Sequence, residues 1–211
     1  MSRKNEQEPA LSRKEKRRAE MLSVAAEMFL EYGYDGTSTD MLVERLGGSK
    51  STIYSYFGSK QEMFESIVLE VASEVFAALP EQPTDDQDLT KALVAFANKY
   101  LSIVLEPRTI SICRAAVAEG RRFPEIGHYF LEMGPMRAAE QLAAWLCLHF
   151  PDGHLPQEDA VILAEQFSNV LKGHFIFRAL AGDEVVLSDA REQRYIEIAV
   201  AQFVAGARAC Y

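Results

Sequence analysis

The segment of residues 49–60 constrains the fold more than any other part of the 211-residue sequence. It follows a short segment with helical periodicity, Thr39 to Leu46, and a two-glycine break. Within it, Ile53 and Phe57 are four residues apart, so on a helix they share one face that points inward. A helix, a glycine-containing turn and a second helix form the arrangement of a helix-turn-helix motif, whose second helix enters the DNA major groove.

The outer face of the second predicted helix is built of side-chain hydroxyl groups. Four residues supply them, namely Ser51, Thr52, Ser55 and Tyr56. A charged helix face usually indicates solvation, and an apolar face usually indicates packing. A hydroxyl face with Lys50 at its start and Lys60 past its end suits a ligand that carries both phosphates and base edges.

The residues from Ser38 to Phe64 resemble the DNA-binding signature of TetR-type repressors. In that signature, a Tyr-x-(His/Tyr)-Phe-x-x-Lys-x-x-(Leu/Met)-Phe tail follows the recognition helix. The matching residues are Tyr54, Tyr56, Phe57, Lys60, Met63 and Phe64. Gly48 departs from the family, which commonly has an apolar residue at this position of the turn. The resemblance implies an all-α chain, with an N-terminal three-helix bundle that contains the helix-turn-helix in residues 11–60 and a larger helical ligand-binding and dimerisation domain in residues 61–211.

The DNA contacts expected from this motif divide into two kinds. We expect Lys50 and Lys60 to contact phosphates, and Tyr54 and Thr39 to add hydroxyl contacts. The candidates for base edges are Ser51, Thr52, Ser55 and Tyr56. Ser38, Thr39 and Ser49 stand at helix starts, where a cap alone and a cap with a bound phosphate are both open interpretations.

The distribution of charge is compatible with DNA binding although the chain has a formal net charge of −9. Residues 1–60 carry 10 Lys and Arg against 9 Asp and Glu, whereas residues 61–211 carry 12 against 22. The acidic charge therefore belongs to the C-terminal part. Because that part repels DNA, the N-terminal face is the one left to bind it, which favours a defined docking pose.

Other features of the sequence indicate a cytoplasmic protein. The longest apolar runs, such as residues 92–97 and 143–148, are too short to span a bilayer, and no apolar segment of a secretion signal follows the start. Three cysteines, Cys113, Cys147 and Cys210, are widely separated and form no CxxC motif, which is typical of reduced thiols. A redox-sensing role for Cys113 is an alternative to a plain buried thiol.

The N-terminal region is expected to begin with a disordered arm, residues 1–10, which is polar and contains a proline. A cluster of basic residues follows, at positions 13, 14, 16, 17 and 18. This cluster is either a solvated face or a phosphate-contacting first helical turn. Apolar residues then repeat at helical spacing from Glu20 to Tyr32, and Gly33 is expected to end this first helix.

The rest of the chain shows helical periodicity and no strand-like alternation. A long connecting helix is expected from Gln61 to Leu79. Five more are expected at about residues 89–105, 109–119, 124–150, 157–181 and 188–210, separated by prolines and glycines. The run Ala-Glu-x-x-Arg-Phe-Pro-Glu at residues 118–125, followed by Gly134 and Pro135, resembles the C-terminal domain of an AefR-like branch of the TetR family. That resemblance implies a ligand-binding and dimerising domain.

An apolar cavity between these helices is the expected site of a small-molecule ligand. Residues that could line it are Phe96, Tyr100, Arg114, His128, Met133, Trp145, Phe167, His174, Phe177 and Arg178. Ordinary core packing is the alternative for most of them. Arg114 and His174 each lie in an apolar helix, so each needs either a ligand or a polar partner such as Glu119 or Glu165.

Catalytic motifs are absent from the sequence. The four histidines form no HExxH pattern, and there is no GxSxG motif and no glycine-rich phosphate loop. A zinc ion between His149 and His154 is not favoured, because these residues flank a Pro-Asp-Gly turn. We therefore expect no enzymatic activity, no cofactor and no metal.

The last two helices are expected to form a homodimer interface of four helices. Their apolar faces exceed what one bundle needs, and small residues on them allow close approach. The first face contains Val161, Leu163, Ala164, Phe167, Val170, Leu171 and Phe175. The second contains Ile196, Ile198, Ala199, Val200, Phe203 and Val204.

Together these observations predict a ligand-responsive, dimeric transcriptional repressor. Two recognition helices would enter successive major grooves of a pseudo-palindromic, double-stranded operator, about 34 Å apart. A small molecule in the C-terminal bundle would lower operator affinity. The alternative is an all-α small-molecule binding or protein-interaction module without specific DNA binding. The sequence does not separate repression from activation.

Overall fold

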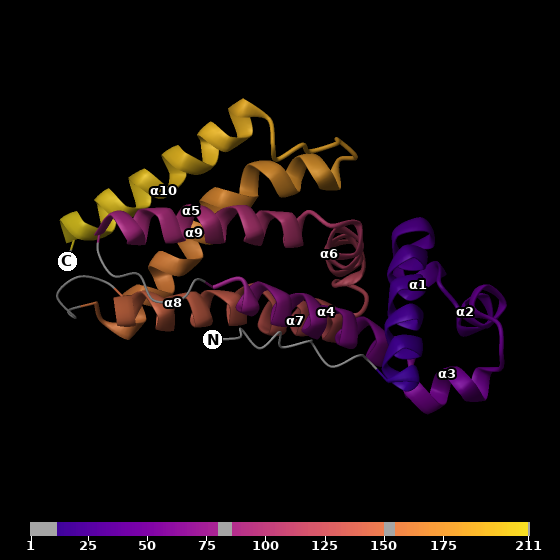
Figure 1. Cartoon of the computed structure of the whole chain (residues 1–211). Helices are drawn as coiled ribbons and strands as arrows, with labels where there is room; N and C mark the ends of the chain where they lie inside the picture. Colours follow the sequence, from indigo (N-terminus) through magenta and orange to yellow (C-terminus); the bar gives the residue numbers. More distant parts are fainter. Residues whose placement is uncertain (1–11, 80–85, 150–154, 211) are drawn as a thin grey trace, which may run out of the picture.

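The structure is a computed structural model that describes residues 12–79, 86–149 and 155–210, and the regular elements in these residues are all helices (Figure 1). The arm expected at residues 1–10 and His154 lie outside the described residues. Three helices, α1 (Arg13–Gly36), α2 (Thr39–Leu46) and α3 (Lys50–Tyr56), form one end of the molecule, and α4 (Lys60–Ala77) extends from them into the rest.

The first helix begins earlier than the sequence indicated. It begins at Arg13 because Ser12 and Glu15 form a capping box, in which each side chain accepts a hydrogen bond from the backbone N–H of the other residue. The regular helix breaks at Gly33 as expected, because Gly33 has the non-helical values φ 74° and ψ 169°. A short helical segment beyond this kink extends α1 to Gly36. The basic cluster therefore lies on the first turns of α1.

The turn of the helix-turn-helix is set by serine caps and by glycine. Ser38, Ser49 and Ser59 are the N-caps of α2, α3 and α4, and each side chain accepts a hydrogen bond from a backbone N–H of the helix that follows. Gly47 and Gly48 have φ values of 68° and 100°, a region that other residues rarely adopt. The positive φ explains why a glycine stands at position 48.

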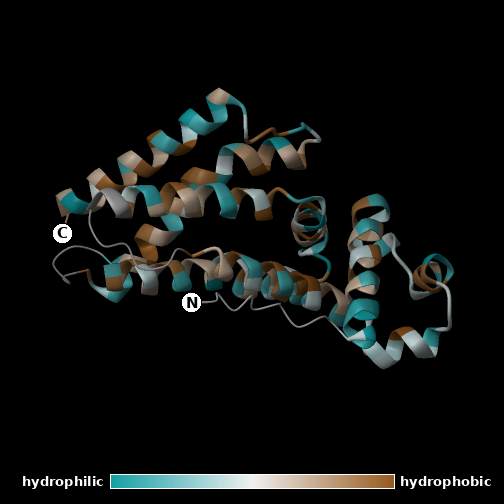
Figure 2. Ribbon diagram, viewed as in Figure 1, coloured by the Kyte–Doolittle hydropathy of each residue, from teal (hydrophilic) through white to brown (hydrophobic). Residues whose placement is uncertain are grey.

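The larger part of the molecule is a bundle of helices, and several of them pack on α4. It contains α5 (Asp86–Val104), α6 (Pro107–Glu119), α7 (Pro124–Leu131), α8 (Arg137–His149), α9 (Gln157–Leu180) and α10 (Ala190–Cys210). Figure 2 shows hydrophobic residues along α4 and the helices packed beside it. One continuous core of buried side chains joins the two parts.

The single helix expected from residue 124 to residue 150 is divided by a π-helical turn, η1 (Glu132–Met136). Pro135 lies inside this turn and has no N–H to donate. Because its ring would also clash with a carbonyl of the preceding helical turn, the backbone widens here instead of continuing as a regular α-helix. The turn separates α7 from α8.

The two parts of the molecule meet where α1 packs on α6. The Tyr34 ring is the centre of this joint, with ring centroids 5.4 Å from Phe29, 5.8 Å from Phe64 and 5.8 Å from Phe123. Phe123 precedes α7, so the aromatic cluster ties the larger part of the molecule to the C-terminal end of α1. None of the described helices has the length and apolar composition of a membrane span.

Candidate nucleic-acid interface and internal cavity

Helix α3 is anchored by two inward side chains and exposes its hydroxyl face. Ile53 and the adjoining Phe57 are each 3% exposed. On the other side, Ser51, Tyr54 and Ser55 are exposed, and Thr52 and Tyr56 are partly buried. The structure therefore places the five hydroxyl-bearing residues of α3 away from its two buried anchors.

The hydroxyl groups at the start of α3 form a short network. The Ser49 hydroxyl lies 2.7 Å from that of Ser51 and 3.0 Å from that of Thr52, and it also accepts the backbone N–H of Thr52. The Ser55 hydroxyl donates to the Thr52 carbonyl oxygen at 2.7 Å. These bonds fix the hydroxyl groups in position while leaving them on the surface, so they are oriented before any ligand arrives.

The two lysines that flank α3 have different environments. Lys50 is exposed, and its ammonium forms an ion pair with Asp40 of α2 at 2.7 Å. The hydrogen bond to Asp40 raises the pKa of Lys50. A phosphate that approaches this surface competes only with one exposed carboxylate for the ammonium.

Lys60 is placed differently from its expected role as a phosphate contact. Its ammonium donates to the carbonyl oxygens of Tyr34 at 2.7 Å and Thr37 at 2.8 Å, and it lies 4.3 Å from the centroid of the Tyr34 ring. Burial lowers the pKa of Lys60. The ammonium thus satisfies carbonyls at the C-terminal end of α1, where a cation is favoured.

The basic cluster on α1 contains both structural and available charges. Arg17 donates to the Leu46 carbonyl oxygen at 2.9 Å, and the Arg18 guanidinium lies 5.1 Å from the Phe57 ring. These two residues hold α1 against the helix-turn-helix. The remaining three are exposed, namely Arg13, Lys14 and Lys16. They line a surface hollow together with Tyr56, which extends the basic surface from α3 to α1.

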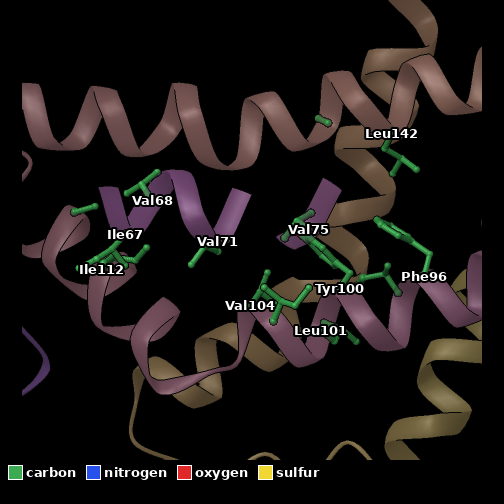
Figure 3. Close-up of a cluster of buried hydrophobic side chains, with 14 of the residues drawn as sticks. Ile67, Val68, Val71, Val75, Phe96, Tyr100, Leu101, Val104, Ile112 and Leu142 are labelled. Carbon is green, nitrogen blue, oxygen red and sulfur yellow. The ribbon is translucent and has the colours of Figure 1, made fainter. Parts of the chain in front are cut away.

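The C-terminal part contains an apolar cavity of about 270 Å³. Residues of α4, α5, α6, α7, η1, α8 and α9 line it. Figure 3 shows Val71 and Val75 of α4 pointing toward Val104 and Tyr100 of α5. The lining includes few polar groups. They come from Tyr100, Thr109, Cys113 and Lys172. Burial raises the pKa of Tyr100 and of Cys113, so both stay neutral near neutral pH.

Of the residues expected to line a cavity, Tyr100 does so. Phe96 stacks beside it with ring centroids 5.6 Å apart. Arg114 donates to the Leu180 carbonyl oxygen rather than to Glu119, and the His174 ring stacks on Tyr195 rather than meeting Glu165. Both polar side chains therefore have partners within the protein, and these are not the acidic residues that were expected.

The other expected residues also have roles outside the cavity. Arg178 forms ion pairs with Asp183 and Glu192. Trp145 stacks on His149, and Phe167 packs against Phe203. Three more do not line the cavity. Phe177 is 78% exposed, His128 is exposed, and the Met133 sulfur accepts a hydrogen bond from the Arg137 guanidinium.

Sequence reasoning missed Lys172 and Cys113 as cavity residues. Lys172 and Ile176 are four residues apart on α9 and both face the cavity, which is a pattern that the sequence offered. Burial lowers the pKa of Lys172. Among the described residues, no group of three or more His, Cys, Asp or Glu side chains could hold a metal ion.

The surface of α9 and α10 differs from the expected dimer interface. Most of the apolar side chains assigned to that interface fill the core of this chain instead, including Phe167, Leu171, Phe175, Ile196 and Val200. Val170 and Ile198 do face outward, at 48% and 41% exposure. Ile162 and Phe177 continue the α9 face at 51% and 78%, so an apolar strip remains uncovered.

The second helix of the motif is capped and exposes a hydroxyl face, and α4 joins this motif to a helical bundle with an apolar cavity. This combination defines the class of helix-turn-helix transcriptional regulators. Family models agree with this geometry over most of the chain. Residues 21–67 match the model of bacterial regulatory proteins of the tetR family, and residues 91–207, more than half of the chain, match the AefR-like transcriptional repressor C-terminal domain. The chain belongs to the tetR family of transcriptional regulators.

Individual relatives and solved structures are consistent with the family. The regulator YvkB of Bacillus subtilis is 25% identical over 88% of this chain and 94% of its own length. YezE of the same organism is 28% identical over 52% of this chain, and the match spans 58% of YezE. A TetR-family regulator structure from Mesorhizobium loti has a TM-score of 0.76, with 22% identity over 93% of this chain and 98% of that one.

Proposed function

We propose that this chain is a dimeric, cytoplasmic repressor that binds a double-stranded operator through α3 and releases it when a small molecule fills the cavity. The observation that carries this proposal is the outer face of α3, where Ser51, Tyr54 and Ser55 are exposed on a helix held by Ile53 and Phe57. Exposed hydroxyl groups on a recognition helix suit the mixed donors and acceptors of the major groove.

The DNA contacts divide between phosphate and base edges. Lys50 exchanges Asp40 for a phosphate, and the Tyr54 hydroxyl, with Ser38 and Thr39 at the start of α2, reaches the DNA backbone. The hydroxyl groups of Ser51, Thr52, Ser55 and Tyr56 face base edges. In this proposal Lys60 supports the motif from inside through its bonds to α1.

The apolar strip on α9 and α10 is the proposed dimer interface. Ile162, Val170 and Phe177 are spaced by eight and seven residues on α9, so they share one face, and Gly173 on the same helix has open space around it. A second copy that covers this strip removes exposed apolar surface and pairs two recognition helices. In a two-fold dimer these helices reach successive major grooves about 34 Å apart.

Helix α4 supplies the route from the cavity to α3. Its first half contributes Met63 and Phe64 to the core beneath the helix-turn-helix, and its second half contributes Val71 and Val75 to the cavity wall. A ligand that favours a different position of α4 changes the spacing of the two recognition helices. The ligand then lowers operator affinity, and the size of the effect is set by how much more tightly the ligand binds the arrangement that does not fit the operator.

Fluorescence anisotropy of the purified protein with its own upstream DNA tests the proposal. Specific binding should exceed binding to random DNA of equal length at near-physiological salt. Thr52→Ala should change the preference among operator variants, and Lys50→Met should weaken all sequences alike and lower the salt dependence. Equal affinity for the upstream fragment and random DNA would instead indicate the alternative, a binding module that does not read DNA sequence.

A further inference from the structure

The cavity contains one residue whose charge nothing in the described structure balances. Lys172 lies on α9 and lines the cavity among valine, isoleucine, leucine and alanine side chains. Within residues 12–79, 86–149 and 155–210, its ammonium makes no hydrogen bond or ion pair. Cys113 and then Glu165 act on it electrostatically, and neither forms a hydrogen bond or ion pair with it. Lys172 is the one charged residue of the lining.

The ammonium stands where it can meet both a ligand and water. The Lys172 side chain is partly buried, and no fully buried side-chain nitrogen or oxygen of the described residues lacks a hydrogen-bond partner. An ammonium without a protein partner must therefore retain contact with solvent, which puts it at the edge of the cavity. The rest of the cavity is apolar, so a ligand can place its hydrocarbon inside and a charged group at Lys172.

An unpaired, partly buried cation has a strong preference for an anion over a neutral group. Burial already makes the charged form of Lys172 costly, as its lowered pKa shows. A carboxylate beside it supplies the missing charge and accepts a charge-assisted hydrogen bond. A ligand with a positive head group is disfavoured there, because it would add a second unbalanced charge beside the ammonium. The other polar side chains of the lining, Tyr100, Thr109 and Cys113, are neutral and do not oppose an anion.

We propose that the cavity binds a small amphipathic monocarboxylate whose acid group pairs with Lys172 and whose apolar body lies between α4, α5 and α6. The size of the body follows from the volume of about 270 Å³. This volume lies just below the roughly 300–1,000 Å³ that is typical of sites for drug-sized ligands, so the body is small, and a chain of about eight carbons is a suitable probe. This inference rests on the proposed function and specifies the chemical class of its effector.

Calorimetric titration of the full chain without DNA tests this ligand class. The probes are octanoate, octanamide and octylammonium, which share an apolar chain and differ in the charge of the head group. We expect octanoate to bind about tenfold more tightly than octanamide, and octylammonium to bind most weakly. Equal affinity for octanoate and octanamide, or no binding of octanoate at millimolar concentration, would overturn the proposal.

Substitution of Lys172 assigns the preference to this residue. In Lys172→Met the octanoate preference should fall to within about threefold of octanamide, whereas Lys172→Arg should retain it. Lys99→Met is the matched control, because Lys99 lies on α5 with an exposed side chain and should not affect the ratio. A full octanoate preference in Lys172→Met would refute the assignment.

The ligand experiment and the operator experiment have separate readouts. Calorimetry measures head-group preference in the absence of DNA, and anisotropy measures operator affinity in the absence of ligand. If specific DNA binding fails while the octanoate preference depends on Lys172, the repressor proposal is wrong and the ligand class stands. If DNA binding is specific and no head-group preference exists, the ligand class is wrong and the regulator proposal stands.

Discussion

Replacing Lys60 with methionine removes three interactions that join α4 to the end of α1. Two are charged hydrogen bonds, to the carbonyl oxygens of Tyr34 and Thr37, and the third is the contact with the Tyr34 ring. A hydrogen bond with a charged partner contributes about 1.5–3 kcal/mol, and a cation near an aromatic face about 0.5–2 kcal/mol. Methionine keeps most of the apolar stem in place.

The net destabilisation is smaller than the sum of these contributions. The Tyr34 carbonyl oxygen also accepts the Thr37 N–H at 3.3 Å, so it keeps one partner. Burial of the Lys60 ammonium has a cost, which the lowered pKa reflects and which methionine does not carry. We therefore expect a loss of about 2–3 kcal/mol in the free energy of unfolding. For a chain of this size that corresponds to a decrease in Tm of roughly 5–10 °C.

Urea unfolding followed by circular dichroism measures the change, with Lys50→Met as the control. Lys50 makes one exposed ion pair with Asp40, so its substitution should cost about 0–1 kcal/mol. In DNA titrations the effects should be reversed, because Lys50→Met lowers the salt slope by about one for each subunit and Lys60→Met leaves it unchanged. A stable Lys60→Met protein with a reduced salt slope would show that this ammonium contacts phosphate instead.

Three further predictions concern the C-terminal part. Lys172→Met should be more stable than the wild type near neutral pH, because burial of the ammonium is costly. This difference in stability should shrink as pH rises from the lowered pKa of Lys172 toward about 10.4, because over this range the unfolded wild-type chain binds more protons than the folded one. Urea midpoints of both proteins across this pH range test the prediction. Phe177→Glu should give monomers by light scattering with unchanged helical content, whereas Val117→Glu, at an equally exposed apolar site on α6, should stay dimeric. Ala138→Leu, which adds three carbons to the cavity wall, should abolish octanoate binding in calorimetry and lower Tm by less than about 5 °C.

The helix-turn-helix could be predicted closely because local signals define it. The expected segment from Thr39 to Leu46 has the same bounds as α2, and Ser49 is the cap of α3 as expected. Serine caps and glycines act within one turn of the residues they affect, so sequence alone reveals them. The capping box at the start of α1 was equally local, and its Ser-x-x-Glu pattern could have corrected that boundary.

The cavity could not be predicted because it depends on which residues leave space. Large side chains such as Phe167 and Trp145 were expected to line it, yet they fill the core and contact other rings. The actual lining contains small residues from distant segments, among them Ala72, Gly134 and Ala138. The space between them exists only in the folded arrangement of helices α4 to α9. Periodicity identifies the inward face of each helix but not the gaps between faces.

The π-helical turn at residues 132–136 sets the rotational phase between α7 and α8. An α-helix advances about 100° with each residue, so deleting one residue here to restore a regular helix would turn α8 by about that angle. Ala139 and Leu142, each 1% exposed, would then turn away from the core. The part of the cavity wall that contains Gly134 and Pro135 would be displaced with them. The width of the cavity is thus fixed by the number of residues in one turn as well as by their side chains.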